Sequence, residues 1–172
     1  PKVLDISLSD VSYAYNGKVR KPTVTVKDRN GKTISKTYYN ISYAKGRKNV
    51  GSYDITVKFR GNYIGTFKRS FIIKPKSTAI YKLTAGKKKL TVKWKKQSVQ
   101  TAGCQIQYAV SSGFKGAKTV NVSNKITEKT ISGLKTGKKY YVRIRTYNNV
   151  KVNGKTTKIY SLWSSASWVK VK

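Results

Sequence analysis

The residues with the clearest chemical potential are two arginines that alternate with apolar residues in the segment YYVRIRTY, residues 140–147. Successive side chains of a β-strand point to opposite faces of the sheet, so the apolar positions predict a core face. The opposite face is then predicted to carry Tyr141, Arg143, Arg145 and Tyr147. A guanidinium presents a planar fork of donors to carboxylate, phosphate or sulfate oxygens, and a phenol ring stacks on a sugar or a base.

A second segment, CQIQYAV at residues 104–110, alternates in the same way. It is predicted to lie beside the first and to add Gln105 and Gln107 to the outer face. The candidate ligand-binding residues are therefore Tyr141, Arg143, Arg145, Tyr147, Gln105 and Gln107. The alternative is a solvated sheet face whose charges only discourage aggregation between sheets.

The charge of the whole chain is strongly one-sided. It contains 38 Lys and Arg residues against 5 Asp and Glu residues, a formal net charge of +33. Lysines on edge strands and loops prevent aggregation, but glutamates would do so equally well. This role therefore does not explain why the charge is positive. Such a field attracts polyanions. We therefore expect an anionic polymer as partner (teichoic acid, acidic glycan or mucin) or a negatively charged host surface.

The supply of catalytic groups is poor. The chain has no His and a single Cys, Cys104, which alternates with predicted core residues and has no His partner. The carboxylates are single and scattered: Asp5, Asp10, Asp28, Asp54 and Glu128. Acid–base catalysis needs positioned titratable groups, and metal sites need converging ligands. We expect no enzyme activity, no catalytic residue, no metal and no cofactor.

Other classes are excluded by missing patterns. The sequence contains no run of about 18 apolar residues, so no membrane span is predicted. The first residues, PKVLDISLSD, contain no apolar segment of the kind found in signal peptides. No Arg-rich arm or nucleic-acid-binding motif is present, so no specific nucleic-acid partner is expected. The chain begins with Pro1, and we expect it to be part of a longer polypeptide whose other domains are its neighbours.

Periodicity of two residues recurs along the chain, and the alternating segments are separated by turns such as Asn16-Gly17 and Asn30-Gly31. No long segment shows the helical apolar period. This pattern predicts an all-β fold of two tandem antiparallel β-sandwiches. Pro75 cannot donate to a β-ladder and marks a boundary, which gives domains at 1–75 and 78–172.

Four segments of the second domain form a recognisable pattern: LTVKW (90–94), CQIQY (104–108), GLKTGKKYYVRIR (133–145) and SLWSS (161–165). In these segments the domain resembles a fibronectin type III domain of Gram-positive surface proteins. The resemblance implies that Trp94 is the buried core indole and that the Tyr140 hydroxyl bonds to the backbone near Leu134. It departs at Cys104, where the family usually has an aromatic residue.

Residues 1–75 resemble a bacterial immunoglobulin-like repeat through YNGKVRKPTVTVKDRNGK (15–32), NVGSYDITVKFRGNYIG (49–65) and FII (71–73). Both resemblances imply a secreted or cell-surface location in a Gram-positive bacterium. The function they imply is a non-catalytic extracellular spacer and adhesion module that binds anionic cell-wall or glycan polymers through a basic face. The alternatives are a structural stalk without ligand and an accessory carbohydrate-binding module of an attached glycan-degrading enzyme.

Two further features of the sequence each allow a structural and a ligand-binding interpretation. Asn153-Gly154, in VKVNGKTTKIY (150–160), predicts a structural hairpin, with a ligand-binding loop as the alternative. Of the neighbouring Trp163 and Trp168, one is expected to pack into the sandwich or against arginine side chains. The alternative role for either ring is stacking on a sugar.

Overall fold

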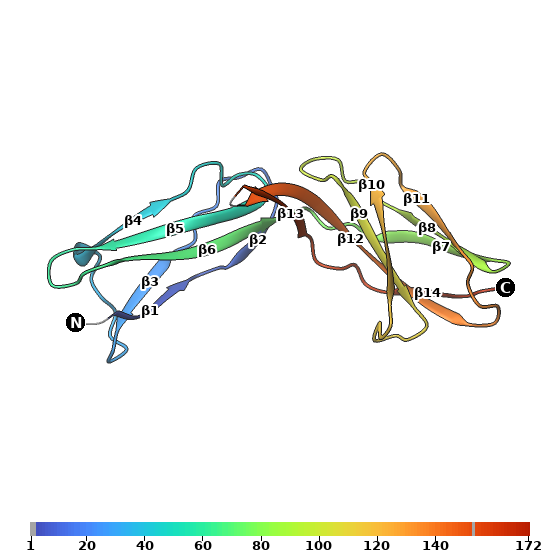
Figure 1. Cartoon of the computed structure of the whole chain (residues 1–172), viewed down its shortest axis with the longest axis horizontal. Helices are drawn as coiled ribbons and strands as arrows, with labels where there is room; N and C mark the ends of the chain where they lie inside the picture. Colours follow the sequence, from blue (N-terminus) through green and yellow to red (C-terminus); the bar gives the residue numbers. More distant parts are fainter. Residues whose placement is uncertain (1–2, 153) are drawn as a thin grey trace. The chain divides into compact units, whose positions relative to one another are not determined.

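Alternating segments form β-strands throughout the computed structural model, which describes residues 3–152 and 154–172 (Figure 1). These residues divide into an N-terminal unit, Pro1–Lys74, and a C-terminal unit, Pro75–Lys172. No α-helix occurs in the described ranges, and a single 3-10 turn, η1 (Lys36–Tyr38), precedes one strand. Consequently no helix in the described part of the chain is long and apolar enough to cross a membrane.

The N-terminal unit consists of a two-stranded and a four-stranded sheet. The smaller sheet pairs β1 (Val3–Leu8) with β3 (Val24–Asp28). The larger has the order β2 (Ser12–Ala14), β6 (Thr66–Lys74), β5 (Gly51–Phe59) and β4 (Tyr39–Tyr43). The short β2–β6 pairing is parallel, whereas the other pairings of this unit are antiparallel.

Inward-facing residues of both sheets, together with Ile34 from the segment between β3 and η1, form the core of this unit: Ile6, Val24, Val26, Ile34, Tyr39, Ile55, Val57, Phe59, Phe71 and Ile73. Polar side chains secure the turns between strands. The Oδ1 atom of Asp28 accepts hydrogen bonds from the backbone N–H groups of Asn30 and Lys32, both at 2.9 Å. Gly31 between them has φ +76°, a conformation that glycine adopts without steric cost.

The C-terminal unit also contains two sheets. One has the order β11 (Glu128–Ser132), β8 (Lys89–Trp94) and β7 (Ile80–Gly86). The other has the order β10 (Lys118–Ser123), β9 (Gly103–Ala109), β12 (Lys139–Val152) and β13 (Lys155–Tyr160), and β14 (Ser167–Lys170) also pairs with β12. All pairings within this unit are antiparallel.

The core of the C-terminal unit confirms the predicted inward face. Trp94, Ile106 and Ile144 are almost completely buried. The Tyr140 hydroxyl accepts a hydrogen bond from the backbone N–H of Lys135 at 3.1 Å, which confirms the predicted bond to the turn at Leu134. The all-β prediction of tandem sandwiches is therefore confirmed.

The predicted hairpin between the last long strands falls partly on Asn153, which lies outside the described residues. The adjoining strands are described, and their register pairs Val152 of β12 with Lys155 of β13. Gly154 has φ +79°.

Candidate ligand-binding face

The register of β9 and β12 brings four of the predicted site residues into direct cross-strand pairs. Arg143 lies opposite Gln107, and Arg145 lies opposite Gln105. The Arg143 Nε donates to Gln107 Oε1 at 2.7 Å. The Arg145 Nε and Nη2 both donate to Gln105 Oε1, at 2.9 and 2.6 Å. The glutamine amides therefore fix the orientation of both guanidinium planes.

Aromatic rings fill the spaces around these two guanidinium groups. The Arg143 Cζ lies 4.0 Å from the centre of the Phe114 ring and 4.6 Å from that of Trp163. The Arg145 Cζ lies 4.2 Å from the Trp163 ring and 3.8 Å from the Tyr160 ring. We call the set Phe114, Arg143, Trp163, Arg145 and Tyr160 the arginine ladder. Trp163 thus confirms the expectation that one tryptophan packs against arginines.

Two serines hold the segment that carries Trp163 against β12. The Ser161 N–H donates to the Thr146 carbonyl, and the Ser161 Oγ accepts from the Thr146 N–H, both at 3.0 Å. Ser164 repeats this arrangement with Ile144, at 2.8 and 3.0 Å. Because both ends of the short segment are fixed to β12, the indole between them is held over the two arginines.

Phe114 reaches the ladder from the turn between β9 and β10. Its backbone has φ +59°, in the left-handed region that bulky residues rarely adopt. Its N–H donates to the Ser111 carbonyl at 3.0 Å, which closes the turn. The cation–π contact with Arg143 offsets part of this backbone strain.

The two arginines carry charges that no acid of the unit neutralises. Glu128 is the only acid in residues 75–172, and its Oε2 lies 2.8 Å from the Lys93 Nζ. Burial lowers the pKa of the Arg145 guanidinium, the Tyr160 ring beside it opposes this shift, and the neighbouring positive charge of Arg143 adds to it. A bound anion would relieve the repulsion between the two cations.

Two of the six predicted residues are not open to solvent. Gln105 and Tyr147 lie on the predicted outer face with Arg145, but each is only 9% exposed. The Tyr147 ring covers Gly103 on the neighbouring strand, and its centre lies 6.0 Å from that of Tyr160. Gln105 lies beneath Arg145 and is shielded by it. The face is therefore a packed ladder and not an open platform.

Tyr141 lies in a separate cluster near the start of β12. The Lys139 Nζ is 5.2 Å from the Tyr141 ring and 3.6 Å from the ring of Trp168, which β14 places opposite Tyr141. Trp168 is 56% exposed. The sixth predicted residue is thus paired with an exposed indole and does not belong to the ladder.

The ladder leaves some guanidinium donors free for a ligand. Both Nη atoms of Arg143 and the Nη1 of Arg145 have no hydrogen-bond partner among the described residues. These donors suit anion oxygens. Burial raises the pKa of the only thiol, Cys104, to about 11. Within the described ranges no cluster of metal-ligating side chains occurs.

Sequence reasoning missed Phe114 and Tyr160 as parts of this face. Phe114 stands in the turn sequence SSGFKG, where an apolar residue between glycines indicates a ring with a packing role. Tyr160 was recognisable from the pattern as the end of a strand, but its contact with Arg145 depends on the path of the chain after β13.

The C-terminal unit thus combines a buried tryptophan, a tyrosine hydroxyl bonded to the preceding turn and an arginine ladder in one β-sandwich. Residues 74–161 match the model of the fibronectin type III domain, and residues 5–77 match that of the MBG domain, an immunoglobulin-like bacterial surface module. The chain belongs to the fibronectin type III family. Domains of these two kinds are typically non-catalytic parts of larger proteins and are common in extracellular or surface proteins.

Comparison with curated protein sequences finds no match. Among solved structures, the chain is similar to one described as the crystal structure of a beta-1,2-glucanase from Parabacteroides distasonis. The likeness covers 68% of the present chain and 17% of that chain, with 12% identity and a TM-score of 0.43. At this score and identity it carries no functional argument.

Proposed function

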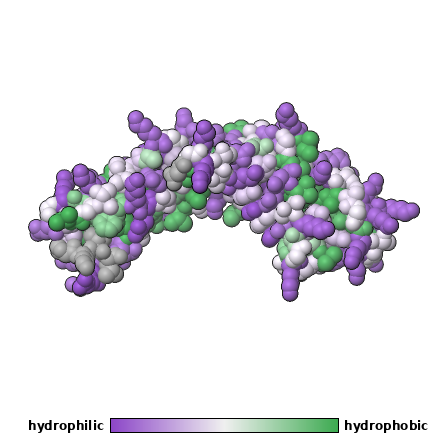
Figure 2. Space-filling model, viewed as in Figure 1, coloured by the Kyte–Doolittle hydropathy of each residue, from purple (hydrophilic) through white to green (hydrophobic). Residues whose placement is uncertain are grey.

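We propose that this chain is an extracellular spacer and adhesion module of a larger bacterial surface or secreted protein, and that its C-terminal unit binds anionic cell-wall or glycan polymers. The observation that carries the proposal is uncompensated charge. Residues 75–172 contain 22 Lys and Arg residues and one acid, which is engaged by Lys93. Hydrophilic side chains cover much of the face seen in Figure 2.

The mechanism begins with long-range attraction, which raises the rate of encounter with a polyanion. Contact at the arginine ladder then adds directional hydrogen bonds from the free Nη atoms of Arg143 and Arg145. Because rings and glutamine amides already hold both side chains, little rotamer freedom is lost when an anion binds. Fixed guanidinium groups therefore favour binding more than flexible lysines of equal charge.

Two other functions have specific support. Packing within the ladder accounts for the presence of both arginines without any ligand, and this favours a structural stalk. The exposed Trp168 beside Tyr141 favours a carbohydrate-binding module, because aromatic rings stack on sugar faces. Salt separates these functions, since ionic strength screens charge contacts and has little effect on stacking.

The test is binding of the full chain to Gram-positive cell walls, with and without their teichoic acid, from low to high salt. We expect binding that requires the polymer and decreases as salt rises. The double variant Arg143→Gln/Arg145→Gln should bind at least tenfold more weakly. Its matched control, Lys95→Gln/Lys96→Gln, removes the same charge from exposed positions and should change binding less than threefold.

Thermal unfolding of each variant shows whether it is folded at the assay temperature. Binding that persists at high salt would favour sugar stacking instead of charge. Absence of binding at every salt concentration would leave the stalk as the function.

A further inference from the structure

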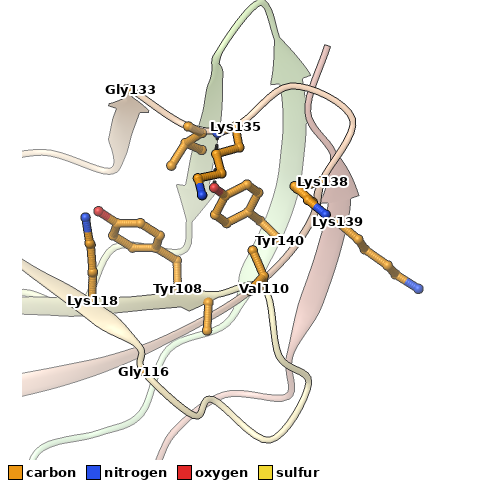
Figure 3. A pocket seen from close by; sticks show the side chains of 11 residues that line it. Tyr108, Val110, Gly116, Lys118, Gly133, Lys135, Lys138, Lys139 and Tyr140 are labelled. Carbon is orange, nitrogen blue, oxygen red and sulfur yellow. Dashed lines mark hydrogen bonds between the residues drawn. The ribbon is translucent and has the colours of Figure 1, made fainter.

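A cavity of about 650 Å³ lies in the C-terminal unit, and no residue of the arginine ladder lines it (Figure 3). Its walls come from the end of β9, the start of β10, the turn between β11 and β12, and the start of β12. We call it the tyrosine pocket, after Tyr108 and Tyr140. Its volume lies within the usual range for small-molecule sites, roughly 300–1,000 Å³.

The fold brings the polar groups of this pocket together by strand register and by one hydrogen bond. Lys118 of β10 is the direct cross-strand partner of Tyr108 of β9. Lys135 is anchored by its backbone N–H, which donates to the Tyr140 hydroxyl at 3.1 Å. In Figure 3 the side chains of Lys118 and Tyr108 extend in the same direction, and the side chain of Lys135 bends toward Tyr140.

One lysine on the rim has a different role. The Lys139 side chain extends away from the pocket in Figure 3 and lies over the Trp168 ring at 3.6 Å. Lys118, Lys135 and Lys138 therefore supply the positive charge of the pocket.

The pocket has donors that the protein does not use. No described residue accepts a hydrogen bond from the Tyr108 hydroxyl or from the side chains of Lys118 and Lys135. The Tyr140 hydroxyl accepts from Lys135, so its own hydrogen remains free for a ligand. No acid lines the cavity. A negatively charged ligand with several oxygens would satisfy these donors together.

The remaining walls are apolar. The Tyr108 ring, Val110 and Leu134 offer a surface for C–H groups. A free inorganic anion would leave this surface uncovered, whereas a sugar ring has a C–H face that packs against a phenol and apolar side chains. The combination of cations, hydroxyl donors and an apolar wall matches a charged sugar.

We propose that the tyrosine pocket binds a pyranose that carries a negative charge, as a carboxylate or a sulfate, at the end or along the chain of an acidic glycan. Lys118 and Lys135 contact the charged group, the tyrosine hydroxyls donate to ring or hydroxyl oxygens, and Tyr108 packs against the sugar face. The ligand class deepens the proposed function, but the residues differ from those of the arginine ladder.

The test is titration of the full chain, followed by nuclear magnetic resonance, with four probes: a uronic acid disaccharide, a sulfated disaccharide, a neutral disaccharide and inorganic phosphate. We expect one or both charged disaccharides to shift the signals of Tyr108, Lys118 and Lys135 and to saturate. The neutral disaccharide and phosphate should bind at least tenfold more weakly. The two charged probes distinguish a carboxylate from a sulfate.

Variants assign the site. Lys118→Gln/Lys135→Gln alters two exposed side chains and should weaken binding of the charged disaccharide at least tenfold. Tyr108→Leu removes the phenol ring and should weaken binding to the same extent. Lys95→Gln/Lys96→Gln removes the same charge outside the pocket and should leave its affinity within twofold. Equal binding of phosphate and charged sugar, or no saturable binding, would overturn the proposal. Loss only in Arg143→Gln/Arg145→Gln would also overturn it while leaving the proposed function intact.

Discussion

The two units use arginine in different ways. In the N-terminal unit, four arginine side chains donate to backbone carbonyl groups: Arg20 to Ala14, Arg47 to Ala44, Arg60 to Thr37 and Arg69 to Ile6. In the C-terminal unit, Arg143 and Arg145 donate to glutamine amides and lie between aromatic rings. The first arrangement fixes the backbone locally, whereas the second aligns two cations side by side on a sheet.

The acids show the same contrast. Four of the five lie in the N-terminal unit, where Asp28 accepts from a turn and Asp54 accepts from Ser70 at 2.8 Å. The C-terminal unit has only Glu128. The C-terminal unit therefore has the larger excess of cations over acids, 22 against 1, and this excess is the reason why we propose it as the polyanion-binding unit.

The largest expected effect comes from a glycine opposite an aromatic residue in the C-terminal unit. A Cβ atom at Gly103 would overlap the Val122 carbonyl oxygen and would lie 2.7 Å from the Tyr147 hydroxyl. Because the backbone of a paired strand cannot move freely, Gly103→Ala should destabilise this unit by about 3 kcal/mol or more. Chemical denaturation measures the change.

The matched variant is Gly51→Ala in the N-terminal unit. There the nearest atoms to a new Cβ belong to the Tyr53 side chain, at 2.8 Å, and not to the backbone. We expect a loss of only about 1 kcal/mol. Equal losses at the two glycines would contradict the view that the Gly103 contact is set by rigid backbone.

The next effect depends on pH and is confined to the C-terminal unit, which holds the only thiol. Burial raises the pKa of Cys104 from 9.0 to about 11, so the folded state keeps its proton where the unfolded state loses it. The stabilisation is complete below pH 9 and decreases as pH rises from 9 to 11. The whole shift corresponds to about 2–3 kcal/mol.

Denaturation at several pH values measures this loss, with Cys104→Ala as the control. Several tyrosines also have raised pKa values, among them Tyr147, whose pKa is raised mainly by burial. The difference between wild type and Cys104→Ala gives the contribution of the thiol together with its charge interaction with Tyr147. Parallel pH profiles for the two proteins would disprove it.

Removal of the central ring of the arginine ladder should have an intermediate effect. Trp163 contacts both Arg143 and Arg145, so Trp163→Ala should cost about 2 kcal/mol from two cation–π contacts. Trp168→Ala removes an exposed ring with one lysine contact and should cost about 0.5 kcal/mol. Thermal unfolding compares the two. A larger loss at Trp168 would mean that the ladder does not stabilise the unit.

An effect smaller than that of Trp163→Ala is expected at the Tyr140 hydroxyl, which is bonded to the turn between β11 and β12. Tyr140→Phe keeps the ring and removes the acceptor of the Lys135 N–H, at a cost of about 1 kcal/mol. Denaturation measures it, and Tyr108→Phe is the control because no described residue binds the Tyr108 hydroxyl. Identical effects of the two changes would show that the bond contributes nothing.

Much of the C-terminal core was predictable from the sequence, because the alternation of apolar and polar residues and the family resemblance can both be recognised within short segments. The inward face of β12 follows from the period of two, whereas the burial of Trp94 and the Tyr140 bond follow from the family pattern. The burial of Tyr147 was not predictable, since it depends on Gly103 standing opposite on another strand. The tyrosine pocket was missed because the Lys118–Tyr108 register is set by the turn between their strands.

The arginine ladder was likewise only partly predictable from the sequence. The exposed side of β12 was predicted as a set of side chains, but alternation does not say what covers them. Phe114 and Trp163 arrive from segments outside the strand, one through a left-handed backbone and one through serine hydrogen bonds.

The most direct test of the central claim compares equal losses of charge in the two units. The affinity of the full chain for soluble teichoic acid would be measured for Arg143→Gln/Arg145→Gln and for Arg60→Gln/Arg69→Gln, both exposed or partly exposed pairs. We expect at least a tenfold loss of affinity for the ladder pair and less than a threefold loss of affinity for the N-terminal pair. Equal losses would contradict it, because binding would then depend on total charge and not on the aligned arginines.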